Sequence, residues 1–421
     1  MMRTSDHLVI GSSHAALAAI AAIRLQAPEA TLTMLTRDRH PPYSPTLLPY
    51  IVSGRARPER AILQEEASLA AERIRFENAA RVAAVRPEAH EVELDDGRTW
   101  RYGKLLLATG AAPAVPPVEG ITKIRFHHLR TLDDSLALRA ALGTARRAVV
   151  LGAGLIGMHA AENFAKAGVA VTIIEPRDHV LPSYFAPDAA AHIAARFATH
   201  GVDLRLGRAA LAAAPAGDGC RLTLDDGESI ETDLLLVATG VRAQCDYLAG
   251  SGIAIGRGIL VDARMQTSAA DIWAAGDVAE APVFPGPHRA VAGILPEAVA
   301  QGRIAGMAMA NDAALQPYRG SVARNTYGFF GETAISVGTG IAGDAPEGAE
   351  TFLRNDPSAG TYCRIVLLEN RLLGIAVVNL PLDAGILCEM IVRRIDLAPC
   401  RKQFLAAPRE TSRRLMSQLW R

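Results

Sequence analysis

Short apolar runs alternate with helical stretches along the first part of the chain. The segment HLVIGSSHAALAAIAAIRL contains an apolar strand, a turn of small residues and an alanine-rich helix, and TLTMLT follows as a second strand. The same order returns in RAVVLGAGLIGMHAAENFAKAG, which is followed by VAVTIIE. Brief apolar runs on either side of a helix are typical of a βαβ unit with parallel strands. The pattern therefore predicts two such units.

A second repeated element follows each unit. YGKLLLATGAAP comes after the polar stretch VELDDGRTW, and TDLLLVATGVRA comes after LTLDDGESI. An Asp-Gly pair between alternating residues predicts a hairpin, and the apolar run after it predicts a strand that returns to the parallel sheet. A repeat of this length indicates duplicated domains rather than a solenoid.

The remaining chain changes in character. LPEAVAQGRIAGMAMA predicts a helix with Pro296 in its first turn, and from about Ser321 the pattern predicts strands followed by helix. We therefore predict an α/β protein. It has two Rossmann-like, three-layer dinucleotide-binding domains and a small C-terminal α+β domain.

The second small-residue turn carries the strongest signal for a dinucleotide. Gly152, Gly154 and Gly157 follow a buried strand and open a helix, and this spacing lets a pyrophosphate approach the helix N-terminus. Glu175 ends the next strand, where a carboxylate can hold a ribose 2′-hydroxyl and would repel a 2′-phosphate. NAD is therefore favoured over NADP, although Arg177 keeps NADP as an alternative.

The first turn departs from this spacing. It has Gly11 at the first place, but Ser13 and Ala16 replace the second and third glycines. Alanine is tolerated at the third place, and the Ser13 hydroxyl could donate to a phosphate oxygen. Asp38 is the candidate ribose carboxylate, although Thr36 lies closer to the strand end.

The segment TSAADIWAAGDVAE supports a flavin at the first turn. Gly276 and Asp277 follow its apolar strand. An aspartate here can accept a hydrogen bond from a ribityl hydroxyl, and the amides of the turn can meet a pyrophosphate.

Charge and cysteine content narrow the class of function. Lysine plus arginine equals aspartate plus glutamate, at 44 each, so no positive field would attract nucleic acid or anionic lipid. No apolar run reaches the length of a membrane span. The five cysteines are scattered without a CxxC pair, which indicates a reducing, cytoplasmic compartment and no metal or iron–sulfur site within the chain.

Together these motifs resemble the pyridine nucleotide–disulfide reductase superfamily in its FAD-then-NAD order. The resemblance implies an FAD-binding domain of residues 1–115 and 245–320, an inserted NAD-binding domain of 116–244, and an interface domain of 321–421. For FAD it implies contacts at Gly11, Ser13, Asp38, Val82, Thr109, Gly110, Gly276 and Asp277. For NAD(H) it implies contacts at Gly152, Gly154, Gly157, Glu175 and Gly240.

Two positions depart from that superfamily. In PPYSPTLLPYIVSG, Thr46 stands where relatives place a redox cysteine. Without a thiolate the chain has no covalent relay beyond the flavin, so disulfide reduction is disfavoured. His159 stands where relatives often carry a glutamate. Thr46 and His159 are the candidate catalytic residues, and packing within its helix is the alternative role for His159.

YSPTLLPYIVSGR and GAGLIGMHAAEN resemble more narrowly the FAD- and NAD-binding subunits of 2-oxoacid:acceptor oxidoreductases that act on phenylglyoxylate. This resemblance implies iron–sulfur and thiamine-diphosphate partner subunits, with benzoyl-CoA as the product of the complex. A flavin suits this role because it exchanges single electrons with iron–sulfur clusters and hydride with NAD. Two alternatives stay open. They are a stand-alone NADH oxidase or rubredoxin/ferredoxin reductase, and a flavin-free assembly subunit.

Overall fold

The computed structural model describes residues 3–419, which divide into two compact units. The first unit contains the residues up to Pro113, Arg130–Leu132 and Val241–Ser321. The second contains Ala114–Leu129, Asp133–Gly240 and the residues from Val322 onward. This two-way division does not test the three predicted domain boundaries, which stay a prediction.

The first unit is built on a seven-stranded sheet with the strand order β3-β2-β1-β6-β5-β4, in which β17 also pairs with β6. Its strands are β1 (Arg3–Ile10), β2 (Leu32–Leu35), β3 (Ile74–Glu77), β4 (Val82–Arg86), β5 (Glu91–Leu94), β6 (Thr99–Leu107) and β17 (Ile272–Ala274). The strands β1, β2, β3, β6 and β17 run parallel, whereas β4 and β5 form the predicted antiparallel meander.

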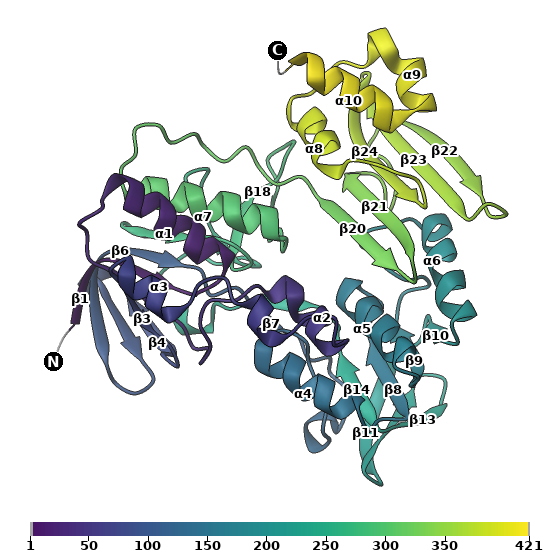
Figure 1. The fold of residues 1–421 in the computed structure, drawn as a ribbon, viewed down its shortest axis with the longest axis horizontal. Helices are drawn as coiled ribbons and strands as arrows, with labels where there is room; N and C mark the ends of the chain where they lie inside the picture. Colours follow the sequence, from purple (N-terminus) through teal and green to yellow (C-terminus); the bar gives the residue numbers. More distant parts are fainter. Residues whose placement is uncertain (1–2, 420–421) are drawn as a thin grey trace. The chain divides into compact units, whose positions relative to one another are not determined.

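The helices of this unit are α1 (His14–Gln26), α2 (Leu48–Val52), α3 (Glu66–Ala71) and α7 (Leu295–Met309). Figure 1 shows α1 and α7 side by side. Their backbones touch because α7 presents glycines to α1. A Cβ atom on Gly302 would lie 2.1 Å from the Ala15 carbonyl oxygen, and one on Gly306 would lie 2.3 Å from that of Ala19. Short strands complete the unit: β7 (Ala111–Pro113), β15 (Val241–Ala243), β16 (Ile259–Leu260), β18 (Ala279–Pro282) and β19 (Arg289–Ala290).

The second unit contains a parallel sheet of four strands in the order β10-β9-β8-β14. Its strands are β8 (Arg147–Leu151), β9 (Ala170–Glu175), β10 (Asp203–Leu206) and β14 (Leu234–Val237). The helices are α4 (Leu132–Leu142), α5 (Leu155–Lys166) and α6 (Pro187–Thr199). The second predicted meander forms a separate sheet of β11 (Ala210–Ala216), β12 (Gly219–Leu224) and β13 (Ser229–Thr232).

The C-terminal part of the second unit is an antiparallel sheet in the order β20-β21-β24-β23-β22, followed by three helices (Figure 1). Its elements are β20 (Arg324–Phe329), β21 (Glu332–Gly338), β22 (Glu350–Asp356), β23 (Thr361–Leu368), β24 (Arg371–Val378), α8 (Ala384–Val392), α9 (Arg401–Ala406) and α10 (Pro408–Leu419). The predicted α/β class, with two parallel sheets and a C-terminal α+β part, is confirmed. Between residues 3 and 419, no helix is long and apolar enough to cross a membrane.

Candidate dinucleotide sites

In the second unit, the glycine turn lies at the carboxyl edge of the parallel sheet. Gly152 follows β8 with φ of +104°, and a Cβ atom there would lie 2.5 Å from the Ala238 carbonyl oxygen at the end of β14. A Cβ atom on Gly157 would lie 2.0 Å from the Gly152 carbonyl oxygen. Gly154 has no atom within 4 Å of its Cβ position. Packing therefore requires two of the glycines, and the third leaves room for a pyrophosphate at the start of α5.

Glu175 is held firmly against this turn. One of its carboxylate oxygens accepts a hydrogen bond from the Ala153 amide at 2.7 Å, and the other accepts one from the Arg177 amide at 3.0 Å. Its side chain is buried at the end of β9. Each oxygen keeps a further lone pair that can accept a hydrogen bond from a ribose hydroxyl. Gly240, just beyond β14, has φ of +106° and open space at its Cβ position.

In the first unit, the carboxyl ends of β1, β6 and β17 bring three predicted segments together. Gly11 follows β1 with φ of +121°, and its Cβ position lies 2.1 Å from the Ala108 carbonyl oxygen after β6. Gly110 comes shortly after β6, at the same edge of the sheet. Gly276 and Asp277 follow β17, which pairs with β6. Ligands of open parallel sheets bind at this edge.

Ser13 is the N-cap residue of α1. Its hydroxyl donates a hydrogen bond to the Tyr43 carbonyl oxygen at 3.2 Å. A serine hydroxyl has one proton, so in this arrangement it is committed to the protein rather than to a phosphate oxygen. The groups that the start of α1 presents to an anion are therefore its free backbone amides and its helix dipole.

Asp38 fixes the segment that follows β2. Its carboxylate accepts hydrogen bonds from the Tyr43 hydroxyl at 2.6 Å and from the His40 amide at 3.2 Å. Burial, followed by this contact with Asp38, raises the pKa of Tyr43. Thr36, which is buried, lies directly at the end of β2 and accepts a hydrogen bond from the Asp38 amide. Asp38 thus has a positioning role in the structure, and its contact with a ribose stays a prediction.

Two further predicted FAD residues lie in different surroundings. Val82 is the first residue of β4, is buried and pairs with Leu94 in the meander. The Thr109 hydroxyl donates to the Gln244 carbonyl oxygen at 3.0 Å and lies 3.2 Å from the Tyr247 hydroxyl. Thr109 therefore joins the end of β6 to the chain that returns from the second unit.

Arg130 belongs to the same site and was missed in the sequence. Its guanidinium forms an ion pair with Asp277 at 3.0 Å and donates to the Ala111 carbonyl oxygen at 2.9 Å. It also lies 3.1 Å from the Cβ position of Gly110. Both partners of the ion pair are partly buried, so solvent and salt screen their attraction only weakly. Arg130 lies in the three-residue return to the first unit, which no local motif reveals.

Thr46 takes part in a line of side-chain hydrogen bonds. The Ser44 hydroxyl lies 2.7 Å from the Thr46 hydroxyl and 2.8 Å from Nε2 of His14, the first residue of α1. Ser44 is buried, His14 is half-buried and Thr46 is exposed. Burial lowers the pKa of His14.

His159 packs against the C-terminal sheet within the second unit. Its ring meets that of Tyr327 edge-on, with 6.0 Å between the ring centroids and an interplanar angle of 81°. One turn later, Glu162 accepts a hydrogen bond from the Phe330 amide at 2.8 Å. This face of α5 therefore contacts β20 and the turn after it. The contact favours packing as the role of His159, and its action on a nicotinamide stays a prediction.

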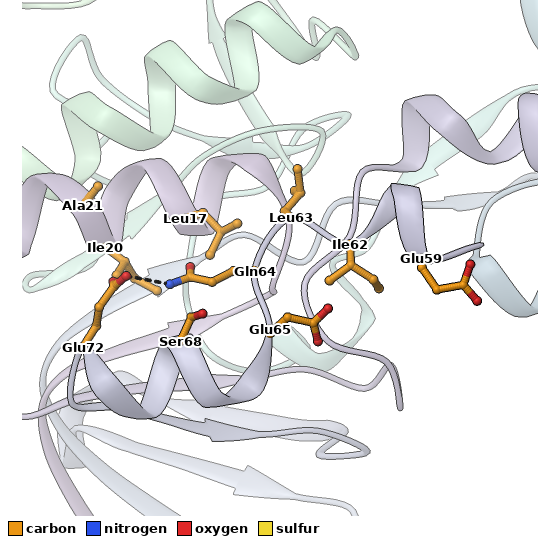
Figure 2. Close-up of a pocket in the computed structure, with 10 residues that line it drawn as sticks. All are labelled: Leu17, Ile20, Ala21, Glu59, Ile62, Leu63, Gln64, Glu65, Ser68 and Glu72. Carbon is orange, nitrogen blue, oxygen red and sulfur yellow. Dashed lines mark hydrogen bonds between the residues drawn. The ribbon is translucent and has the colours of Figure 1, made fainter. Parts of the chain in front are cut away.

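Figure 2 shows a cavity of about 570 Å³ on another face of α1. Leu17, Ile20 and Ala21 form one side of it, and the segment 59–72 forms the other. None of the predicted dinucleotide residues lines it. Three of its lining residues are Glu59, Glu65 and Glu72, whose carboxylates would repel a pyrophosphate.

Two glycine turns in one chain, each at the carboxyl edge of a parallel sheet and at the start of a helix, define an oxidoreductase with two dinucleotide sites. Residues 5–302 match the pyridine nucleotide-disulphide oxidoreductase family, and the chain belongs to this family. The predicted class of enzyme and the predicted cofactors, FAD and NAD(H), are confirmed.

The relatives include oxidoreductases of several kinds. The NADH-dependent phenylglyoxylate dehydrogenase subunit epsilon of Aromatoleum evansii is 46% identical over 418 residues, which cover 99% of this chain and 98% of that protein. The nitric oxide reductase FlRd-NAD(+) reductase of Escherichia coli O7:K1 is 34% identical over 65% of this chain and 72% of that protein. The water-forming NADH oxidase of Lactobacillus brevis, bound to NADH, has a TM-score of 0.85 and 25% identity over 93% of this chain and 92% of that one.

Proposed function

We propose that the chain is the FAD- and NAD-binding subunit of a 2-oxoacid oxidoreductase complex. In this role it exchanges electrons between an iron–sulfur partner and NAD⁺. The observation that carries the proposal is the combination of two dinucleotide turns, one with all three glycines and one with Ser13 and Ala16 in place of two of them, with a threonine, not a cysteine, at position 46. Such a chain can exchange electrons through a flavin but has no thiol at this position to pass them on to a disulfide.

The residues of the chain bind and orient the two dinucleotides. The amides at the start of α1 and the Arg130 guanidinium would hold the FAD pyrophosphate, and Asp277 would accept a ribityl hydroxyl. The open space at Gly154 would admit the pyrophosphate of NAD, and the Glu175 carboxylate would bind a ribose hydroxyl. FAD supplies the step between single electrons and hydride. No side chain is needed as an acid or base for hydride transfer itself.

The substrate of the complex is inferred from the Aromatoleum relative. Its name describes a subunit of an NADH-dependent phenylglyoxylate dehydrogenase, and the match spans nearly the whole of both chains. We therefore infer phenylglyoxylate as the oxidised 2-oxoacid and benzoyl-CoA as the product. Thiamine-diphosphate and iron–sulfur subunits would carry out that oxidation. The complex would work in the cytoplasm, which supplies NAD and keeps cysteines such as these five, none of which forms a disulfide, reduced.

An anaerobic titration of the purified chain with NADH and with NADPH tests the proposal. We expect NADH, but not NADPH, to bleach the flavin absorbance, because the Glu175 carboxylate would repel a 2′-phosphate. The variant Glu175→Gln should reduce the difference between NADH and NADPH in how well they reduce the flavin. If NADH leaves the bound flavin oxidised, the electron-transfer function is wrong.

A free-standing reductase is the second candidate, favoured by the 34% identity to the FlRd-NAD(+) reductase. Gentle purification from the native cell separates the two. Iron–sulfur and thiamine-diphosphate subunits that co-purify would support the complex. A chain that purifies alone and turns over rapidly with rubredoxin or oxygen would support the free-standing reductase. A colourless chain would instead indicate a flavin-free assembly subunit.

A further inference from the structure

We propose that His14, Ser44 and Thr46 form a proton relay to the flavin, which works when electrons arrive one at a time. This inference rests on the proposed function. It concerns the source of the proton that the reduction of a flavin requires. A hydride carries its proton with its electrons, whereas an iron–sulfur partner delivers electrons alone, so the proton must then come from the protein or from water.

The relay lies against the dinucleotide turn of the first unit. Ser13 donates to the Tyr43 carbonyl oxygen at 3.2 Å, and the next residue, His14, is hydrogen-bonded to Ser44 at 2.8 Å. These two contacts hold the segment 43–46 against the start of α1, where FAD would bind. Thr46 then extends the line of hydrogen bonds by one step of 2.7 Å.

The three groups can conduct a proton in sequence. A neutral imidazole carries one proton and accepts another, and burial favours the neutral form of His14 by lowering its pKa. With the proton on Nε2, His14 donates to Ser44, Ser44 donates to Thr46, and the Thr46 hydroxyl is left to donate outward. Ser44, the middle member, is buried, so bulk water does not reach its hydroxyl, whereas Thr46 at the end of the line is exposed.

Reduction of the flavin by single electrons consumes a proton, and in our proposal the relay supplies it. When bound, FAD would need one proton for every two electrons that an iron–sulfur partner delivers, if it is to be left ready for hydride exchange with NAD⁺. In our proposal Thr46 gives its hydroxyl proton to the flavin and receives one from Ser44. Ser44 is refilled from Nε2 of His14, and Nδ1 of His14 takes a proton from water. Every side chain ends neutral, and His14 changes only its tautomer.

Reduction by two donors of different kinds tests the relay in the FAD-loaded chain. Reduced methyl viologen supplies single electrons, whereas NADH supplies hydride, and each reduction is followed anaerobically in H₂O and D₂O. Thr46→Val removes the terminal hydroxyl at nearly constant shape. We expect it to slow the viologen reaction roughly tenfold more than the NADH reaction and to abolish the solvent isotope effect on the former. Thr46→Ser should restore both.

Ser53→Ala is the matched control, since the Ser53 hydroxyl lies in the same region and donates to the Tyr50 carbonyl oxygen outside the relay. It should behave as the unmodified chain does. If Thr46→Val slows the two reactions by equal factors, or slows neither, the relay is overturned. Failure of NADH to reduce the unmodified chain would instead overturn the proposed function.

A measurement without flavin tests the His14–Ser44 step. In the flavin-free chain labelled with ¹⁵N-histidine, the nitrogen shifts report which tautomer each ring adopts. Ser44→Ala should change the tautomer balance of His14 but not that of His90, whose Nδ1 lies 3.3 Å from the Tyr102 carbonyl oxygen. Unchanged His14 shifts in Ser44→Ala would show that the ring does not depend on Ser44, and the relay would be rejected.

Discussion

At the scale of single residues, the first-unit site depends on one charge that the chain brings in from a distance. The Arg130 guanidinium contacts Asp277, the Ala111 carbonyl oxygen and the surroundings of Gly110. A guanidinium presents its donors in a fixed plane, so one side chain can join an aspartate and a backbone oxygen at the same time. Arg130 therefore organises this edge of the sheet before any ligand arrives.

Replacement of Arg130 should weaken FAD binding. We expect Arg130→Met to raise the dissociation constant of FAD about tenfold to a hundredfold, since it removes a partly buried charge-assisted contact. The dissociation constant for Arg130→Lys should lie between those of the unmodified chain and Arg130→Met, because an ammonium keeps the charge but not the planar donors. Fluorescence titration of the flavin-free chain measures the constant. Arg101→Met, at an exposed ion pair with Glu91, is the control and should change little.

His7 should make the chain sensitive to mild acid. Burial in β1, together with the charge of Lys104, lowers the pKa of His7 to about 4. Between that value and the ordinary histidine pKa of about 6.5, the unfolded chain binds a proton that the folded chain does not. Stability should thus fall as the pH drops through this window.

The contribution of His7 between pH 7 and pH 5 should be about 1–2 kcal/mol. Urea unfolding at the two pH values measures it. His7→Leu should lessen the loss of stability by that amount, whereas His288→Leu, at an exposed position, should not. Equal losses in His7→Leu and the unmodified chain would contradict this origin of the acid sensitivity.

The residues that spacing alone singles out are those with a local steric constraint. Gly152 and Gly157 could be recognised from spacing alone because each avoids a clash within a few residues or with the adjoining strand. The contacts of Arg130 with Asp277 and of His14 with Ser44 join positions far apart in the chain. No periodicity encodes such pairs, so they became visible only in the fold.

At the scale of elements, the first unit depends on how closely α1 and α7 approach. Both helices are rich in alanine, and their backbones touch where α7 has Gly302 and Gly306. The approach also places Gln301 so that its side-chain oxygen accepts a hydrogen bond from the Gly276 amide at 2.9 Å. The packing of the two helices and the shape of the Asp277 turn are therefore linked.

Gly302→Ala should destabilise the first unit. The added Cβ atom would lie 2.1 Å from the Ala15 carbonyl oxygen, and backbone cannot yield as a flexible side chain can. We expect a loss of about 2 kcal/mol or more in the free energy of unfolding, measured with denaturant. Gly385→Ala in α8 is the control, because nothing lies within 4 Å of its Cβ position. It should gain up to about 1 kcal/mol through helix propensity. Equal effects of the two substitutions would refute the packing argument.

The elements themselves are largely predictable, whereas their partners are not. Pro296 in the first turn of α7 and the Asp-Gly hairpins of both meanders follow from local turn and helix chemistry. The pairing of β17 with β6 and the contact of α7 with α1 depend on surfaces that meet only after folding. The first meander joins the large sheet but the second forms its own, a difference that the repeated sequence pattern does not reveal.

At the scale of the whole molecule, the thiols bear on how many electrons the chain can hold. None of the five cysteines forms a disulfide, and four of them are buried. Burial raises the pKa of Cys220 to about 11 and also raises those of Cys245 and Cys363. Thiols with raised pKa values form little thiolate at neutral pH and are poor electron carriers. These three thiols are therefore unsuited to carry electrons, and in the proposed function bound FAD is the electron store.

The electron capacity can be counted. Because FAD accepts two electrons and Thr46 supplies no sulfur, a single equivalent of NADH per FAD should complete the anaerobic reduction. A redox disulfide would require a second equivalent before the spectrum stopped changing.

Thr46→Cys adds a test of position, since a thiolate in contact with oxidised flavin gives long-wavelength absorbance. The appearance of that band would place residue 46 against the flavin. A Thr46→Cys variant without the band would contradict that position. An unmodified chain that consumes two equivalents of NADH would contradict the absence of a second electron carrier.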